Sequence, residues 1–224
     1  MKQPPSILSE LRRNLVLPAF KSTDVHVWRG LIDVCAGCGI TILEFRDGRE
    51  SRGLKVFPFL VEYATRYPQF KIGVSTIKNI PACETFIRQG AAFISSPFVN
   101  PLLAKLCHRY ERAWIPGCSS IEDVRQAADN GAEVVSVLHG PLANGYLGLI
   151  KREFEKLAFI PSSGNELNDN KVTEWLAAGA LCIRKEQTIF PTALTSIRDW
   201  IGIDRLLRKE MESIRKQCSE LAAA

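Results

Sequence analysis

The chain alternates between amphipathic stretches and short apolar runs along most of its length. Four amphipathic stretches end at a glycine, which is followed by a small or β-branched residue and then by a hydrophobic run; these junctions are Gly39-Ile40, Gly90-Ala91, Gly131-Ala132 and Gly179-Ala180. Glycine ends a helix readily because it adopts left-handed backbone angles, and the apolar run after it suits a strand buried on both faces. The pattern predicts a repeated helix-to-strand unit.

Eight apolar segments are candidates for strands, at residues 15–20, 40–46, 71–77, 92–97, 113–118, 133–139, 157–162 and 180–185. Helix-start signals lie between them at Ser22-Thr23-Asp24, Asn79-Ile80-Pro81, Asn100-Pro101 and Ser119-Ser120-Ile121-Glu122. Eight strands alternating with eight helices predict a parallel (β/α)8 barrel, the TIM barrel fold. We expect one domain over residues 1–224, with residues 191–224 forming a C-terminal helical segment.

Composition narrows the class of protein. The 224 residues are 46% hydrophobic and 24% charged, which is enough to build one large core. The N-terminal stretch has no apolar core of a signal peptide, and no run approaches the length of a membrane span, so we expect a cytoplasmic protein without a membrane partner. The net charge is +5, but the basic residues are spread out or interleaved with acids. A solvated surface therefore explains the charge better than nucleic-acid binding.

Seven cysteines fall mostly inside predicted helices and strands, as free thiols do in a reducing compartment. Cys35 and Cys38 have the CxxC spacing of redox and zinc sites, but no second CxxC follows. We interpret this pair as core packing, and we expect no metal and no cofactor.

Chemistry in such a barrel belongs at the C-terminal ends of the strands and in the loops that follow them. Polar or small residues stand at most of these ends. In chain order they are Glu44, Arg49, Ser75, Thr76, Ser96, Pro97, Pro116 to Ser119, Ser136, His139, Ser162 to Gly164, Arg184 and Lys185. A ligand is expected among these residues.

These segments resemble a known family, the 2-keto-3-deoxy-6-phosphogluconate / 4-hydroxy-2-oxoglutarate (KDPG/KHG) aldolases. The similarity runs in order over nearly the whole chain. The segments that carry it are LEF at 43–45, GVST at 73–76, SSPFVNPLLAKLC at 95–107, IPGCSS at 115–120 and GAEVVSVLHG at 131–140. The resemblance implies the barrel fold, a 2-keto acid substrate or another small anion, and a homotrimer.

The resemblance also identifies one departure that matters for activity. Family members form a Schiff base between a strand-six lysine and the keto carbon of the substrate, and the matching position here is Ser136. A serine hydroxyl cannot form the iminium ion that accepts electrons when the carbon–carbon bond breaks. We therefore expect a protein that is inactive as a class I aldolase.

Glu44 matches the family's general acid/base, and a buried carboxylate needs a partner, for which Arg46, Arg49, Arg184 and Lys185 are candidates. Of the family's phosphate-binding Gly-Gly turns, Ser163-Gly164 keeps half of the first, and Arg184-Lys185 replaces the second. The substrate contacts that the resemblance implies are Arg49, Thr76, Pro97, Ser136, His139, Ser163, Gly164 and Arg184.

Three readings of the site stay open. In the first, Lys185 takes over the Schiff base, with Glu44 as the acid/base; the simpler alternative is that Arg184 and Lys185 pair with Glu44 or Glu186. In the second, the pocket binds a small carboxylate or phosphate without catalysis, because Arg184, Lys185 and Arg49 could donate charge-assisted hydrogen bonds. In the third, Glu44, His139 and Cys118 form a metal site or a Cys–His pair.

Overall fold

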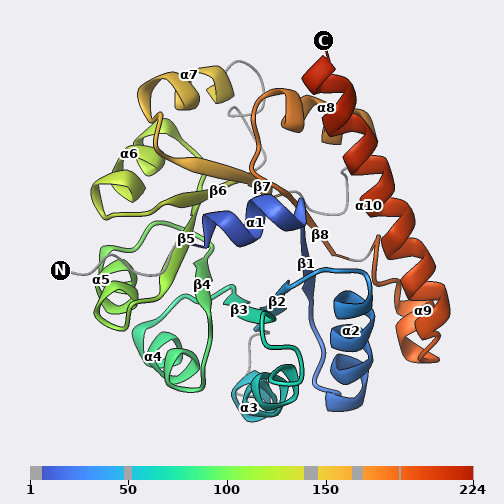
Figure 1. Cartoon of the computed structure of the whole chain (residues 1–224). Coiled ribbons are helices and arrows are strands. Elements are labelled where there is room, and N and C mark those ends of the chain that lie inside the picture. Colours follow the sequence, from blue (N-terminus) through green and yellow to red (C-terminus); the bar gives the residue numbers. More distant parts are fainter. Residues whose placement is uncertain (1–6, 48–51, 139–145, 163–168, 187, 224) are drawn as a thin grey trace.

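Eight parallel strands form a nearly closed barrel in the computed structural model of the chain (Figure 1). The structure describes residues 7–47, 52–138, 146–162, 169–186 and 188–223. The strands are β1 (Val16–Phe20), β2 (Ile42–Arg46), β3 (Lys71–Ser75), β4 (Phe93–Ser96), β5 (Ala113–Cys118), β6 (Val134–Leu138), β7 (Ala158–Ser162) and β8 (Ile183–Lys185). All eight predicted strands and the TIM-barrel fold class are confirmed.

The strands follow the chain order around the barrel, with β8 paired to β1. Between β7 and β8, the amide of Leu181 donates to the carbonyl of Phe159 at 2.9 Å. Parallel strands all point the same way, so their C-terminal ends share one face of the barrel.

Helices surround the strands (Figure 1). Their bounds are α1 (Leu8–Asn14), α2 (Val25–Gly37), α3 (Arg52–Ala64), α4 (Ile80–Arg88), α5 (Pro101–Arg109), α6 (Ile121–Asp129), α7 (Tyr146–Glu153), α8 (Asp169–Ala177), α9 (Thr192–Ser196) and α10 (Trp200–Ala223). Among the described residues, no helix has the length and apolar character needed to cross a bilayer.

The local signals read from the sequence act as expected. The side chains of Asp24, Asn79, Asn100 and Ser120 accept hydrogen bonds from backbone amides at the starts of α2, α4, α5 and α6. The four junction glycines have φ between 76° and 99°, the left-handed region in which a Cβ is disfavoured. These caps end each helix so that the chain turns directly into the next strand.

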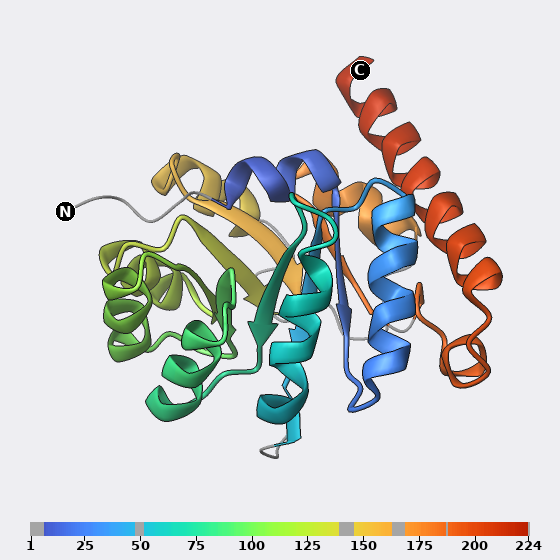
Figure 2. The ribbon, with the colours of Figure 1, turned by 60° about the horizontal axis from the view of Figure 1, so that its bottom comes forward.

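The barrel interior contains its own apolar cluster. One inward-facing side chain from most strands contributes to it, and the fully buried members from the strands are Leu17, Ile42, Phe93, Ile115 and Ile160. The first helix, α1, lies across the N-terminal end of the barrel (Figures 1 and 2), and it adds Leu11 to the cluster together with Ile7, which directly precedes the helix. The sequence analysis did not identify α1. This end is thus closed by packing, which leaves the opposite end for ligands.

The C-terminal segment predicted to be helical contains α9 and α10. The long helix α10 packs against α2 and α8 on the outside of the barrel, and its last turns extend past the barrel (Figure 2). Its inward face carries Ile203, Leu207, Met211 and Ile214, all buried at helical spacing. α10 therefore covers the outer side of β8 and its neighbours.

Candidate active site

A polar layer lies directly above the apolar interior, toward the C-terminal ends of the strands. Glu44, Ser95 and Ser136 each stand two residues after an inward-facing apolar residue of the same strand. Strand side chains alternate between faces, so residues two apart point the same way. All three are buried, as is Arg184, which stands two residues after the interior Cys182 at the start of β8. Four strands thus bring one acid, one cation and two hydroxyls together inside the barrel.

Arg184 connects the members of this layer. Its Nη2 lies 3.0 Å from Oε2 of Glu44 and 3.5 Å from Oγ of Ser95, and its Nη1 donates to Oγ of Ser136 at 2.7 Å. The side chains of Arg184 and Glu44 are 6% and 2% exposed. Ser136 and Ser95 add hydrogen bonds to the two terminal nitrogens of Arg184, and such additional bonds help a buried ion pair to be tolerated. The predicted pairing of Arg184 with Glu44 is confirmed.

This arrangement determines which chemistry the barrel centre can support. A guanidinium donates hydrogen bonds and carries positive charge but is not a primary amine, so it forms no imine with a keto acid. In the described part of the chain, no hydrogen bond or ion pair of Glu44 or Ser136 involves a lysine. In the described residues of this layer, the positive charge therefore comes from a guanidinium and not from a primary amine.

Lys185 points away from this layer. Its Nζ lies 2.7 Å from Oε1 of Glu210 on α10, outside the barrel, and its side chain is 5% exposed. Neighbouring residues of a strand face opposite sides, so Arg184 and Lys185 cannot both enter the interior. This geometry does not support a role for Lys185 beside Glu44. Arg46, another predicted partner of Glu44, instead pairs with Glu186.

The other predicted site residues are distributed as follows. Thr76 has a left-handed backbone with φ 64°, and its hydroxyl donates to the carbonyl of Asp47 at 2.5 Å. The carbonyl of Pro97 lies against Gly117, where a Cβ would approach it to 2.5 Å, so the two strand ends are packed backbone to backbone. Arg49, His139, Ser163 and Gly164 lie outside the described residues.

The cysteines pack as small apolar side chains. Burial raises the pKa of the Cys35 and Cys118 thiols, the latter to about 12, and Cys38 donates to Asp204 at 3.3 Å. Cys35 and Cys38 both lie in the outer core around α2, as the packing interpretation predicted. Within the described ranges, no group of three histidine, cysteine or acidic residues is arranged to hold a metal ion.

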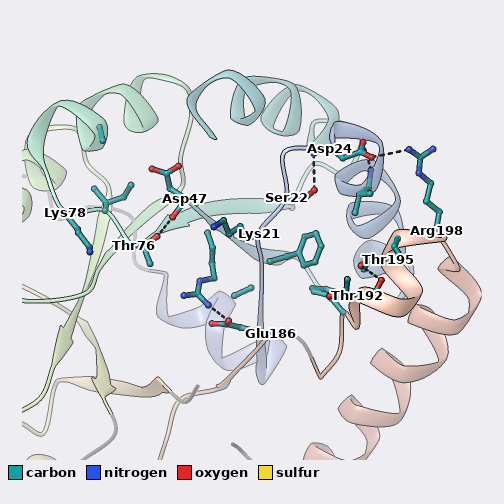
Figure 3. A pocket seen from close by; sticks show the side chains of 18 of the residues that line it. Lys21, Ser22, Asp24, Asp47, Thr76, Lys78, Glu186, Thr192, Thr195 and Arg198 are labelled. Carbon is teal, nitrogen blue, oxygen red and sulfur yellow. Dashed lines mark hydrogen bonds and ion pairs between the residues drawn. The ribbon is translucent and has the colours of Figure 1, made fainter. Parts of the chain in front are cut away.

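A cavity of about 910 Å³ opens beside the barrel centre (Figure 3). Its walls come from the ends of β1, β2 and β3, from Glu186 after β8 and from α9. Lys21, Asp47 and Lys78, which follow β1, β2 and β3, line it together with Thr76. Sequence reasoning missed these three residues, although each stands just after a strand, where ligand-binding residues of barrels are expected.

Asp47 is the most perturbed acid of this cavity. Burial raises the pKa of its carboxyl to about 6, against the opposing effect of the Lys21 charge. Its Oδ1 is buried and has no hydrogen-bond partner in the described part of the structure. Its backbone is fixed, because its amide donates to the carbonyl of Ser75 at 3.2 Å and its carbonyl accepts from Thr76. The carboxyl is thus held at the cavity wall by its main chain.

Comparisons with known proteins agree with the barrel fold. The 2-dehydro-3-deoxy-phosphogluconate aldolase of Pseudomonas aeruginosa is 24% identical over 184 residues, and the match covers 81% of each chain. The enzyme of the same name from Haemophilus influenzae is 22% identical over 214 residues, which cover 93% of this chain and 97% of that one. The KDPG aldolase of Legionella pneumophila, solved with pyruvate captured as a covalent carbinolamine intermediate, shares the fold with a TM-score of 0.78 at 19% identity, over 92% of this chain and 98% of that one.

A second solved aldolase gives the same result for the fold. The KDPG aldolase of Zymomonas mobilis superimposes with a TM-score of 0.74 at 19% identity, over 91% of this chain and 95% of its own. The family model described as "KDPG and KHG aldolase" matches residues 7–206, from α1 into α10. The match includes every strand of the barrel and both the polar layer and the cavity. The chain belongs to the KDPG and KHG aldolase family.

Proposed function

We propose that this protein is a KDPG/KHG-aldolase-like barrel that does not form a Schiff base, with Ser136 at the position of the family's lysine. The observation that carries the proposal is the 2.7 Å hydrogen bond from Arg184 to Ser136, together with the ion pair from Arg184 to Glu44. Arg184 supplies the positive charge that balances Glu44. The family's acid/base carboxylate is therefore retained as a structural partner.

The chemical argument is that imine formation needs an uncharged primary amine within bonding distance of the keto carbon. Ser136 has a hydroxyl, and Arg184 has a guanidinium that is already engaged by Glu44, Ser95 and Ser136. Without the iminium, electrons from the breaking carbon–carbon bond lack the acceptor on which the Schiff-base mechanism depends. Glu44 alone cannot replace that acceptor, because a general base moves protons only.

Borohydride trapping tests this proposal. The protein is incubated with pyruvate, reduced, digested and analysed by mass spectrometry, with the KDPG aldolase of Legionella pneumophila as the positive control because pyruvate is captured on it covalently. We expect an adduct on the control and none on this chain. A stable adduct on any lysine would overturn the proposal, and an adduct on Lys185 would establish the alternative of a migrated lyase centre.

A second candidate function is noncovalent binding of a small carboxylate or phosphate, such as a 2-keto acid. The cavity beside the barrel centre supports it, because its volume of about 910 Å³ suits a small metabolite and two lysines line it. Among the anchors predicted from the sequence, Arg184 and Lys185 are buried and paired with Glu44 and Glu210. Other cations must therefore hold the anion.

The resemblance to the family also supports a homotrimer in the cytoplasm. Multi-angle light scattering on the purified chain tests the assembly: we expect about three times the mass of the 25.0 kDa chain. A monomer mass would remove the homotrimer from the proposal without affecting the argument on Schiff-base chemistry.

A further inference from the structure

Two buried cysteines touch each other between neighbouring helices on the outside of the barrel. Sγ of Cys83 on α4 lies 3.9 Å from Sγ of Cys107 on α5, although 24 positions separate them in the sequence. Both side chains are fully buried in the outer core, and both are free thiols. The two helices lie side by side around the barrel (Figure 1). The thiols therefore connect the helix that precedes β4 with the helix that follows it.

The other cysteines are arranged differently. The structure describes all seven, and within the described residues no other two thiols are hydrogen-bonded to each other. Cys35 and Cys38 have the CxxC spacing, but the Cys38 thiol donates to Asp204 on α10 at 3.3 Å. The thiol-to-thiol contact is thus made by two cysteines whose sequence spacing gives no sign of it.

A surface cluster holds α4 and α5 together beside this contact. Tyr110, just after α5, donates its hydroxyl hydrogen to Oε1 of Glu84 at 2.7 Å, and Glu84 directly follows Cys83. Nη2 of Arg88 lies 2.8 Å from the same carboxylate oxygen, and its guanidinium lies 5.3 Å from the centre of the Tyr110 ring. These contacts fix the two helices relative to each other, so the two sulfur atoms stay adjacent.

Only a small movement separates this contact from a covalent bond. A disulfide places its sulfur atoms about 2.0 Å apart, so each sulfur must move by about 1 Å. Displacements of about that size are ordinary thermal motion in folded proteins. Contact with Cys83 and burial raise the pKa of the Cys107 thiol, so the reactive thiolate is scarce and the pair stays reduced without an oxidant.

We propose that Cys83 and Cys107 form a reversible disulfide in the folded protein when hydrogen peroxide is present. One thiolate attacks a peroxide oxygen, the O–O bond breaks, and the products are a sulfenic acid and hydroxide. The second thiolate attacks the sulfenic sulfur and displaces a second hydroxide. Two thiols are oxidised, one peroxide is reduced, and the two thiol protons convert both hydroxides to water.

This inference does not depend on the proposed function. Neither cysteine lines the cavity beside the barrel centre, and neither hydrogen-bonds to a residue of the polar layer in the described part of the chain. A disulfide here would tie α4 to α5 around β4 and leave the chemistry of the barrel centre as it is. Its presence or absence is therefore measured separately from Schiff-base formation.

Peptide mapping of the full chain tests the bond. The chain is reduced, desalted, treated with hydrogen peroxide in native buffer, alkylated and digested with trypsin without a reducing agent. Cleavage after lysine and arginine places Cys83 in the peptide 79–88 and Cys107 in the peptide 106–109. We expect these two peptides to be joined, with a mass lower than their sum by two hydrogen atoms, and dithiothreitol should separate them.

Two alanine variants locate the bond. Cys83→Ala should give no cross-linked form of the peptide 106–109, because the partner thiol is gone. Cys118→Ala removes another fully buried thiol of the outer core, one that contacts the carbonyl of Pro116, and it should keep the cross-link at the native yield. The cross-link in the native chain is measured without either variant, so the test still decides if one of them folds poorly.

Thermal melts test whether the native structure accommodates the bond. The oxidised chain should melt about 5 °C or more above the same sample after dithiothreitol, because the bond closes a long loop in the unfolded chain. This comparison isolates the disulfide, since dithiothreitol leaves oxidised methionine unchanged. An oxidised chain that melts at or below the reduced one would show that the bond forms at the expense of the folded structure, and would overturn the inference.

Three mapping results would also overturn it. Oxidation of the half-buried Cys218 without the cross-linked peptide would mean that the peroxide acts and the buried pair does not react. A disulfide between Cys35 and Cys38 formed first would place the oxidisable pair at the CxxC spacing. In denaturant, the seven cysteines should pair in many combinations. The same mixture from the native chain would mean that the folded contact does not direct the bond.

Discussion

The barrel centre and the cavity beside it lie over the same ends of the strands but differ in how they treat charge. In the centre, Glu44 and Arg184 are almost fully buried and pair with each other, and Arg184 also donates a hydrogen bond to Ser136. In the cavity, Lys21 and Lys78 are exposed and have no ion-pair partner in the described part of the chain. A buried charge must be neutralised by other groups of the protein, whereas an exposed charge is stabilised by water and stays available to a ligand. The comparison separates charges that the fold neutralises from charges that stay exposed to solvent.

The largest expected effect comes from breaking the central ion pair. Arg184→Met leaves Glu44 buried without its cation, and we expect a loss of about 3–5 kcal/mol in the free energy of unfolding. Chemical denaturation measures it. Adding Glu44→Leu should recover most of the loss, because an apolar pair has no desolvation cost.

The neighbouring residue on β8 provides a matched control for Arg184. Lys185→Met also removes a cation, but the partner Glu210 is 22% exposed and can be hydrated once the pair is broken. A cost of about 1 kcal/mol is expected. If the two single variants lose the same free energy of unfolding, Glu44 is as accessible to water as Glu210, and the barrel centre does not differ from the surface of α10 in this respect.

A smaller effect on stability, with a clear chemical signal, is expected when the amine is returned to the centre. Ser136→Lys alone places a second cation against Arg184 and should cost about 2–3 kcal/mol. Combined with Arg184→Ala, the new lysine can pair with Glu44, so stability should largely recover. The double variant should then give a borohydride-trapped pyruvate adduct on the introduced lysine, detected by mass spectrometry.

The single variants control this experiment. Arg184→Ala without the new lysine should give no adduct, because the centre then holds no amine. A double variant that is stable but forms no adduct would mean that the barrel centre no longer admits a keto acid. In that case the missing lysine is only one of the differences between this chain and family members that form the Schiff base.

Much of the fold could be predicted because its signals are local. The four junction glycines and the caps Asp24, Asn79, Asn100 and Ser120 act on their own helix ends, whatever the rest of the chain does. The apolar strand runs are equally plain in sequence. Helix α1 was missed because its contribution to the barrel, Ile7 and Leu11, is too short to show a helical period.

The site was predicted only in part, because it depends on which way side chains point. The sequence indicated a cation for Glu44, but only the structure separates Arg184, which faces inward, from Lys185, which faces α10. Lys21 and Lys78 are exposed loop residues with no periodic pattern around them. Their common cavity is bounded on its other side by α9, which is far along the chain from the first strands, and a local pattern does not encode such an arrangement.

The smallest expected effect concerns Asp47, the cavity acid whose pKa is raised by burial. Burial raises the pKa of its carboxyl to about 6, above the ordinary value of 3.8, so the folded protein holds this proton more tightly than the unfolded chain does. The folded state therefore loses stability as the pH rises through the interval between these two values. Lys21 opposes the shift, and the Arg46–Glu186 pair and Lys78 also face the cavity.

Asp47→Asn should remove this dependence, because an amide stays uncharged. We expect the variant to match the native chain near pH 4 and to be more stable near pH 7, by less than about 1 kcal/mol since the carboxyl is half exposed to screening solvent. Thermal melts at each pH measure the difference, with Glu155→Gln as a control that removes an exposed carboxylate outside the cavity. Sulfate, which does not titrate in this interval, should bind the native chain more tightly as the pH falls from 7 to 5, and Asp47→Asn should flatten that change. A variant that instead loses stability at pH 7 would show that a donor holds the ionised carboxylate in the native chain.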